Sequence, residues 1–285
     1  MSGFNRFLQK VIKTISGYKL HDCGKDYFAL SKDNVEIECL FPGSLLLMEK
    51  NACEMEKNKG IYDYLRQLRL KTILEKYQIN VVLDVGANIG QFAQDLRKLD
   101  YQGRIISFEP LSSAFEVLKE VSDNDSEWEV HQIALGKQNG EKTINIADQS
   151  VFTSFLQSNS WCEQQFGQSS VGRGKETVIV RRLDQVLPEK IENIDQARIY
   201  LKIDTQGYDL EVFMGLGEIQ TMISALQSEI SVVPIYQDMP HLINSISLFE
   251  KAGFELAGMY PVNYDQSTLR VIEFDCLMVN SNIRK

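Results

Sequence analysis

The chain has 285 residues, a formal net charge of −9, 44% hydrophobic residues and 24% charged residues. These proportions are ordinary for a soluble globular protein, and no run approaches the ~20 apolar residues that a membrane span needs. The excess of acidic residues disfavours a nucleic-acid partner, because phosphate binding needs a basic surface. We therefore expect no integral membrane segment, and a small-molecule or carbohydrate substrate fits the charge better.

The cysteines indicate a reducing compartment. Their number is odd, they lie far apart and no C-x-x-C pair occurs, which disfavours disulfides, zinc and redox chemistry; they are Cys23, Cys39, Cys53, Cys162 and Cys276. The N-terminus lacks the unbroken apolar region and cleavage site of a secretion signal. We expect a cytoplasmic protein.

The N-terminal part predicts an extension in front of the main domain. Residues 4–15 have apolar side chains at helical spacing with Lys and Arg elsewhere on the helix. Such a helix can contact a membrane surface or a partner, although packing on the protein's own core or on a second subunit of a homo-oligomer is commoner. Short alternating segments between residues 18 and 49 predict the strands of a small cap. We expect an extension of residues 1–58 and a catalytic domain of residues 59–285.

The main domain alternates apolar strand patterns with helical patterns, which is typical of a parallel sheet with crossover helices. Helices are expected at 59–77, 90–99, 112–122, 208–216 and 241–252, and strands at 81–85, 104–108, 128–135, 142–147, 177–183, 198–203, 225–233, 254–260 and 271–279. A Ser-, Gln- and Gly-rich segment at 149–174 is expected to be a long loop, either a lid over a carbohydrate or a disordered linker.

A glycine turn between a buried strand and a helix indicates a cofactor site. Its backbone N–H groups lie close to a ligand at a helix N-terminus. Dinucleotide sites need G-x-G-x-x-G, whereas Asn88 and Gln91 replace the second and third glycines. The turn therefore favours S-adenosylmethionine over NAD, since the Asp84 carboxylate suits a sulfonium and an amino-acid tail. The turn residues expected to bind this cofactor are Asp84, Gly86, Ala87, Asn88 and Gly90.

Glu109 follows the next strand, where a carboxylate can accept hydrogen bonds from both ribose hydroxyls. Because NAD sites place an acid similarly, Glu109 alone indicates a nucleoside without saying which one. The alternative is a helix-capping turn and an unrelated exposed glutamate.

The motifs together resemble the FkbM family of methyltransferases over residues 80 to 280; they are Leu83 to Gly90, Phe108-Glu109-Pro110, Ala134-Leu135-Gly136, Leu183-Asp184 and Leu201 to Gly207. The resemblance implies an α/β class I methyltransferase (Rossmann-like) fold, with a seven-stranded mostly parallel sheet whose last strand is antiparallel. It also implies that Pro110 and Ala134 lie at the cofactor and that hydroxyls of sugars or natural products are methylated. Gln206 stands where glutamate is common, which argues against a role of this position as a base.

The acceptor side needs one base to remove the hydroxyl proton. Asp204, at the carboxyl end of a central strand, is our first candidate, and capping of helix 208–216 is its structural alternative. Glu229, an acid among apolar neighbours, is the second. His241 at a helix start is a further candidate, whereas His131 inside a strand is more typical of a core histidine.

No metal site is predicted. Asp204, Asp209 and Glu229 could supply oxygen ligands to a divalent ion, but no spacing in the sequence is specific for one.

The resemblance favours an S-adenosylmethionine-dependent O-methyltransferase acting on a hydroxyl of a sugar, glycan or glycolipid. Methylation of a secondary metabolite is one alternative. A non-catalytic S-adenosylmethionine-binding partner protein is another, supported only by Gln206. An NAD-dependent oxidoreductase is disfavoured by the altered glycine pattern and by the lack of an evident Tyr/Lys pair.

Overall fold

A computed structural model of the chain describes residues 11–14, 18–22, 28–31, 35–38, 46–49, 54–167, 172–265 and 267–283. The chain divides into two units, Met1–Tyr62 and Asp63–Lys285. The predicted boundary after residue 58 stays a prediction.

The first unit contains short elements. Residues 11–14 are helical, and the rest of the predicted 4–15 helix lies outside the described residues. Two antiparallel strand pairs follow, formed by β1 (Lys19–Asp22) with β2 (Phe28–Ser31) and by β3 (Val35–Glu38) with β4 (Leu46–Glu49).

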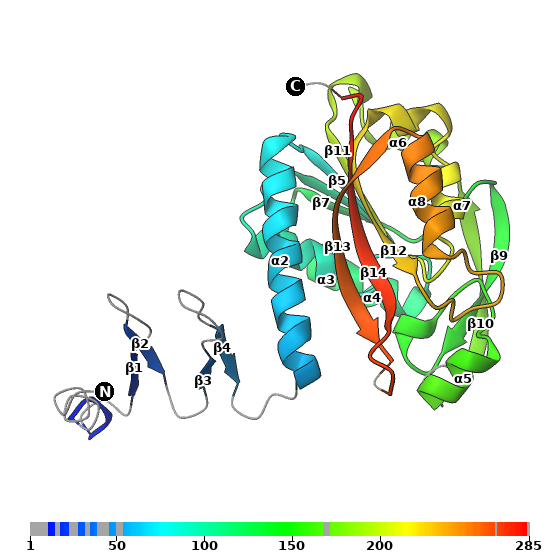
Figure 1. The fold of residues 1–285 in the computed structure, drawn as a ribbon. Helices are drawn as coiled ribbons and strands as arrows, with labels where there is room; N and C mark the ends of the chain where they lie inside the picture. Colours follow the sequence, from blue (N-terminus) through cyan, green and yellow to red (C-terminus); the bar gives the residue numbers. More distant parts are fainter. Residues whose placement is uncertain are drawn as a thin grey trace. The chain divides into compact units, whose positions relative to one another are not determined.

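The second unit is built on a seven-stranded sheet of order β13-β14-β12-β11-β5-β6-β7 (Figure 1). Its strands are β5 (Val81–Val85), β6 (Arg104–Phe108), β7 (Trp128–His131), β11 (Ile199–Ile203), β12 (Ile223–Ser231), β13 (Phe254–Tyr264) and β14 (Val271–Asn280). Neighbouring strands are parallel except for β14, which is antiparallel to both β12 and β13. The predicted mostly parallel sheet with an antiparallel last strand is confirmed.

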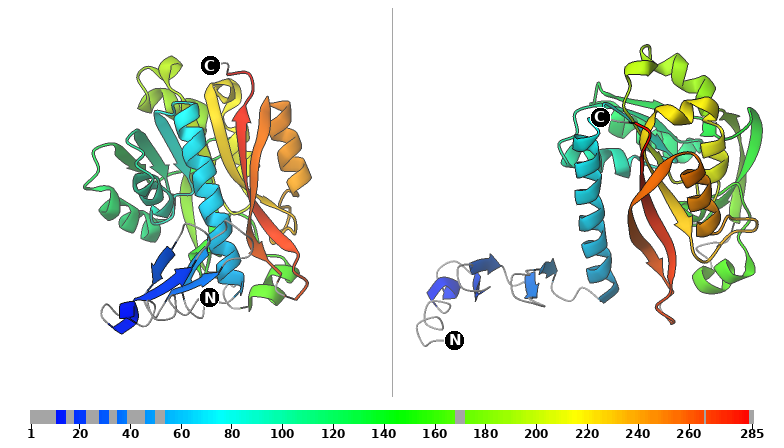
Figure 2. Two further views of the ribbon diagram at one scale, coloured as in Figure 1. Left: turned by 60° about the vertical axis from the view of Figure 1, so that its left-hand side comes forward. Right: turned by 45° about the horizontal axis from the view of Figure 1, so that its top comes forward.

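Helices cover both faces of this sheet, and Figures 1 and 2 show α2 and α8 on opposite sides of it. One core joins α2 (Glu54–Lys76), α3 (Gln91–Lys98) and α4 (Ser112–Ser122) to Val82. The other joins α6 (Leu183–Lys190), α7 (Asp209–Met214) and α8 (Leu242–Lys251) to Leu83. Successive strand residues point to opposite faces, so both faces of β5 are buried and its sequence is apolar at almost every position.

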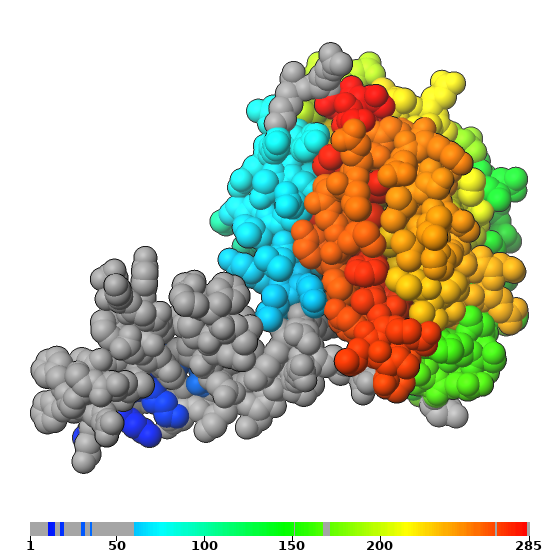
Figure 3. All heavy atoms as spheres, viewed as in Figure 1, coloured from blue at the N-terminus to red at the C-terminus, as the bar shows by residue number. Residues whose placement is uncertain are grey.

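The side chains of α2 lie next to those of β13 on the face shown in Figure 3. In the described part of the chain, no helix combines the length and apolar composition needed to cross a membrane.

A second, three-stranded sheet of order β8-β10-β9 corrects three predictions. It comprises β8 (Ala134–Leu135), β9 (Gly140–Ala147) and β10 (Gly172–Arg181). The predicted strand 128–135 is wrong in its continuity, because the chain leaves the main sheet after His131 and pairs with β10 at Ala134.

The predicted loop 149–174 is also wrong in part. It contains η1 (Ser150–Phe152) and α5 (Ser160–Phe166), and β10 begins at Gly172. The α5 residues Trp161, Cys162 and Phe166 pack in a small core with Tyr236, which stabilises this helix.

The predicted strand 177–183 ends too late, because Leu183 begins α6. Leu183, Val186 and Leu187 are buried at helical spacing, and Pro188 near the end of this short helix obscures the pattern. Two 3₁₀ helices, η3 (Ile194–Gln196) and η4 (Gly217–Met222), complete the elements.

Candidate cofactor and acceptor site

The glycine turn after β5 is in direct contact with the loop after β11. The Asp204 backbone N–H donates a hydrogen bond of 3.0 Å to the Val85 carbonyl. Gly86 has φ of +77°, and a Cβ atom added there would lie 1.9 Å from the Asp204 carbonyl oxygen. Only glycine therefore allows this approach, which brings the two principal sequence motifs together.

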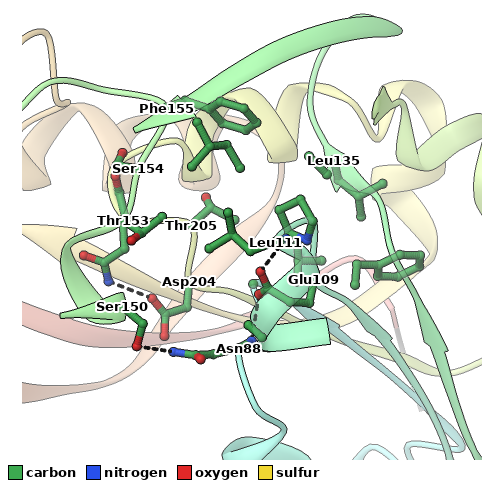
Figure 4. Close-up of a pocket in the computed structure, with 18 of the residues that line it drawn as sticks. Asn88, Glu109, Leu111, Leu135, Ser150, Thr153, Ser154, Phe155, Asp204 and Thr205 are labelled. Carbon is green, nitrogen blue, oxygen red and sulfur yellow. Dashed lines mark hydrogen bonds between the residues drawn. The ribbon is translucent and has the colours of Figure 1, made fainter. Parts of the chain in front are cut away.

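Glu109 lies at the carboxyl end of β6 and is held by the turn. Its Oε2 accepts a hydrogen bond of 2.9 Å from the Asn88 N–H, and its Oε1 accepts one of 2.9 Å from the Leu111 N–H (Figure 4). Asn88 has φ of +50°, a left-handed conformation that asparagine tolerates better than most residues. Burial raises the pKa of Glu109 to about 7, although the two backbone N–H groups and Lys202 act in the opposite direction.

One pocket joins the turn, Glu109 and Asp204. It holds about 780 Å³ of empty space, part of it open to solvent. Its apolar lining includes Phe108, Leu111, Ala114, Ile133, Leu135, Ile144 and Phe155. Its polar lining includes Ser150, Thr153, Ser154, Thr205 and Gln206. The predicted cofactor residues Gly86, Asn88, Glu109, Pro110 and Ala134 line it as well.

Asp84 is fully buried and lies outside this lining. The Lys202 Nζ lies 3.2 Å from Asp84 Oδ1 and 3.4 Å from Asp204 Oδ2, and it donates to the Gly86 carbonyl at 3.2 Å. Burial alone would lower the pKa of Lys202, but Asp84 and Asp204 raise it above its usual value. The ammonium thus stays charged and connects the glycine turn to the loop after β11. Its ion pair with Asp84 and its hydrogen bond to the Gly86 carbonyl stabilise the turn.

Ala87 and Gly90 are likewise absent from the described residues that line the pocket. Ala87 is buried. Gly90 has φ of +88°, and a Cβ atom there would lie 2.8 Å from the Trp128 ring. Packing against Trp128 accounts for this glycine, and the cofactor roles assigned to both residues stay predictions.

Asp204 faces the pocket, and its side chain is 40% exposed. The alternative that it caps the following helix does not match the geometry. The N-cap of α7 is Tyr208, without a side-chain hydrogen bond, and the Thr205 N–H donates to Asp209 Oδ1 at 2.9 Å. Asp204 is instead bonded to Lys202 and to Gln206.

Glu229 lies outside the pocket lining. Its Oε2 accepts a hydrogen bond of 3.1 Å from Gln206 Nε2. Burial and then the neighbouring Glu273 and Asp204 raise the pKa of Glu229 well above its usual value. Burial and the neighbouring carboxyl groups thus favour the neutral form of Glu229.

The two candidate histidines are bonded elsewhere. His241 is the N-cap of α8, and its Nδ1 accepts from the Ile243 N–H at 3.4 Å. His131 Nε2 lies 2.7 Å from Glu129 Oε1, and burial lowers the pKa of His131. Neither is among the described residues that line the pocket, and a catalytic role for His241 stays a prediction.

Sequence reasoning missed the importance of Lys202 and Tyr236. A lysine inside an otherwise apolar strand was an available signal, because a buried charge needs a partner. Tyr236 left no such signal. Within the described ranges, no group of three or more His, Cys, Asp or Glu side chains is arranged to hold a metal ion.

The sheet order, with a pocket at the carboxyl ends of its central strands, defines the class I methyltransferase fold that the motifs predicted. Residues 84–256 match the family model for the Methyltransferase FkbM domain. The chain belongs to the FkbM methyltransferase family, as predicted.

One relative and three solved structures illustrate the similarity. "Methyltransferase 1" of Beauveria bassiana (strain ARSEF 2860) is 27% identical over 150 residues, which are 48% of this chain and 58% of that protein. The chain thus spans less than two thirds of this relative's length.

The structures resemble the chain at low identity. A putative S-adenosylmethionine dependent methyltransferase from Listeria monocytogenes has 8% identity, covers 78% of this chain and 99% of that chain, and gives a TM-score of 0.42. Magnesium protoporphyrin IX methyltransferase from Synechocystis PCC 6803, with bound SAM, has 10% identity, coverage of 82% and 87%, and a TM-score of 0.40. An rRNA methylase from Streptococcus thermophilus has 10% identity, coverage of 76% and 95%, and a TM-score of 0.40.

Proposed function

We propose that the chain uses S-adenosylmethionine to methylate a hydroxyl group of a sugar, glycan or glycolipid. The observation that carries this proposal is the single pocket lined by the glycine turn, by Glu109 and by Asp204. It offers one carboxylate, Glu109, that suits a nucleoside and a second, Asp204, that suits the role of a base. When bound, the cofactor supplies a methyl group on a sulfonium.

The lining fits the parts of this cofactor. A carboxylate has about four lone-pair sites, and the Asn88 and Leu111 N–H groups occupy two of those on Glu109. The remaining two suit the two hydroxyls of a ribose. The apolar side chains around Leu111 and Leu135 form a slot for an adenine, and they exclude water.

Asp204 is placed to remove the proton of the acceptor. In the transfer the acceptor oxygen would form a bond to the methyl carbon while the methyl–sulfur bond breaks and S-adenosylhomocysteine leaves, and the hydroxyl proton would pass to an Asp204 carboxylate oxygen. Lys202 and Gln206 hold this carboxylate, so no reorganisation is needed when the acceptor arrives.

The charges near Asp204 favour an uncharged polar acceptor. The nearby Lys202 is already paired with Asp84 and Asp204, so its ammonium is not free to bind an anion, and Asp204 itself carries a negative charge. A phosphate or carboxylate next to the reacting oxygen would meet like charge. Neutral glycosides fit this surrounding better than acceptors with a phosphate beside the hydroxyl.

Release of S-adenosylhomocysteine tests the proposal. We would incubate the full chain and S-adenosylmethionine with neutral oligosaccharides and glycosides, with nucleotide sugars and with hydroxylated secondary metabolites. We expect turnover on a neutral sugar, and a kcat at least ~100-fold lower for Asp204→Asn, as is usual when a general base is lost. Asp195→Asn, at an exposed position, is the matched control.

Each outcome points to one interpretation. Turnover only on secondary metabolites would show that the acceptor is a secondary metabolite and not a sugar. Cofactor binding without turnover on any compound of the panel would support a non-catalytic binding protein. Full activity of Asp204→Asn removes Asp204 as the base.

A further inference from the structure

Gln206 occupies a strained position beside the proposed base. Its φ is +52°, a left-handed conformation that a residue with a side chain adopts at a cost. The Gln206 carbonyl accepts a hydrogen bond of 2.6 Å from the Ser154 hydroxyl. Residues kept in such conformations persist only where the surroundings hold them, and they concentrate at functional sites.

The Gln206 amide joins the side chains of Asp204, Glu229 and Tyr236. Its Nε2 donates to Asp204 Oδ1 and to Glu229 Oε2, each at 3.1 Å. Its Oε1 accepts from the Tyr236 hydroxyl at 3.0 Å. The opposite orientation of the amide would place its oxygen against two carboxyl groups, so these partners define how it points.

We propose that Gln206 is a positioning residue, whose amide fixes the Asp204 carboxylate toward the acceptor and separates it from Glu229. This proposal rests on the proposed role of Asp204 as the base. The amide is a neutral donor between two acids, which a third carboxylate could replace only when protonated. Around it lie the charged and titratable groups Asp84, Lys202, Asp204, Asp209, Glu229, Tyr236, Glu273 and Asp275.

Kinetics of Gln206→Met separate positioning from general damage. Methionine keeps the length of the side chain and removes both donors. We expect kcat on the acceptor found in the screen to fall about 10- to 100-fold, as for a misaligned catalytic group, and the KM for S-adenosylmethionine to stay within about twofold. Gln237→Met, at an exposed neighbour of Tyr236, should match the wild type.

Gln206→Glu adds a pH signature. The glutamate can donate to Asp204 only in its protonated form. The activity of the Gln206→Glu variant relative to the wild type should therefore rise as the pH falls from 8 to 6. A Gln206→Met protein with wild-type kcat overturns the proposal. Equal losses in kcat and in cofactor affinity overturn it as well, because they indicate general disruption of the pocket.

An acceptor-independent measurement keeps the two proposals separate. In full-length protein labelled with ¹⁵N-glutamine, the side-chain amide signals of Gln206 should shift in Asp204→Asn, in Glu229→Gln and in Tyr236→Phe, while those of Gln237 stay in place. If the Gln206 signals do not shift in Asp204→Asn and Glu229→Gln, the proposed bridge, in which the Gln206 amide bonds both carboxyl groups, is overturned. A protein that shows the bridge but binds no S-adenosylmethionine refutes the proposed function instead.

Discussion

Glu109 should make cofactor affinity depend on pH. Burial raises the pKa of Glu109 to about 7 in the free protein. Two lone-pair sites of its carboxylate are taken by backbone N–H groups, so two ribose hydroxyls can both donate only to the charged form. Binding near and below pH 7 must therefore remove a proton, and the affinity falls as the pH falls.

The size of the effect follows from this pKa. Each unit below pH 7 costs tenfold, so binding at pH 5.5 should be about 30-fold weaker than at pH 8, or about 2 kcal/mol. Calorimetry with S-adenosylhomocysteine and with adenosine measures it. Adenosine has the ribose without the amino-acid tail, so an equal slope for both ligands assigns the effect to the ribose contact.

The control variants identify the titrating group. Glu109→Gln should remove the pH dependence, and Glu116→Gln, at an exposed position of α4, should keep it. An affinity that is independent of pH in the wild type refutes the reasoning. A slope that persists in Glu109→Gln assigns the titration to another group.

Three further predictions concern stability, each measured by urea unfolding of the full chain. Lys202→Met leaves the buried Asp84 without its cation and should cost about 3–5 kcal/mol; an unchanged midpoint would show that the ion pair is dispensable. Gly86→Ala should cost more than ~2 kcal/mol from left-handed strain and backbone overlap. Gly174→Ala, where an added Cβ meets no atom within 4 Å, should cost far less. Equal costs for the two variants would argue against the close approach of Gly86 to Asp204. Tyr236→Phe should cost about 1 kcal/mol for one lost hydrogen bond, and no loss would argue that this bond is absent in solution.

The central sheet could be predicted because its strands are buried on both faces. β5 and β11 are apolar at nearly every position for that reason. The position of Glu109 in the pocket could be predicted because it directly follows β6. The break between β7 and β8 could not, since a continuous apolar pattern does not tell which sheet a strand joins.

The side chains around Asp84 could not be predicted either, because they depend on how the strands pair. Strand alternation puts its side chain on the same face as Val82, under the helices, and the register pairs it with Lys202. Neither the pairing nor the hydrogen bond from Gln206 to Glu229 follows from spacing along the sequence, because the pairing joins β5 to β11 and the hydrogen bond joins the loop after β11 to β12. The sequence located the ends of the strands that meet at the site, and the register determined which side chains touch.

The central claim is that this pocket holds an adenosyl cofactor, and a calorimetric comparison of S-adenosylmethionine, S-adenosylhomocysteine and NAD tests it most directly. We predict that both adenosyl ligands bind at pH 8, that Glu109→Ala weakens them at least ~10-fold by removing the ribose contact, and that NAD shows no measurable binding. Binding of NAD without binding of either adenosyl ligand would contradict the account.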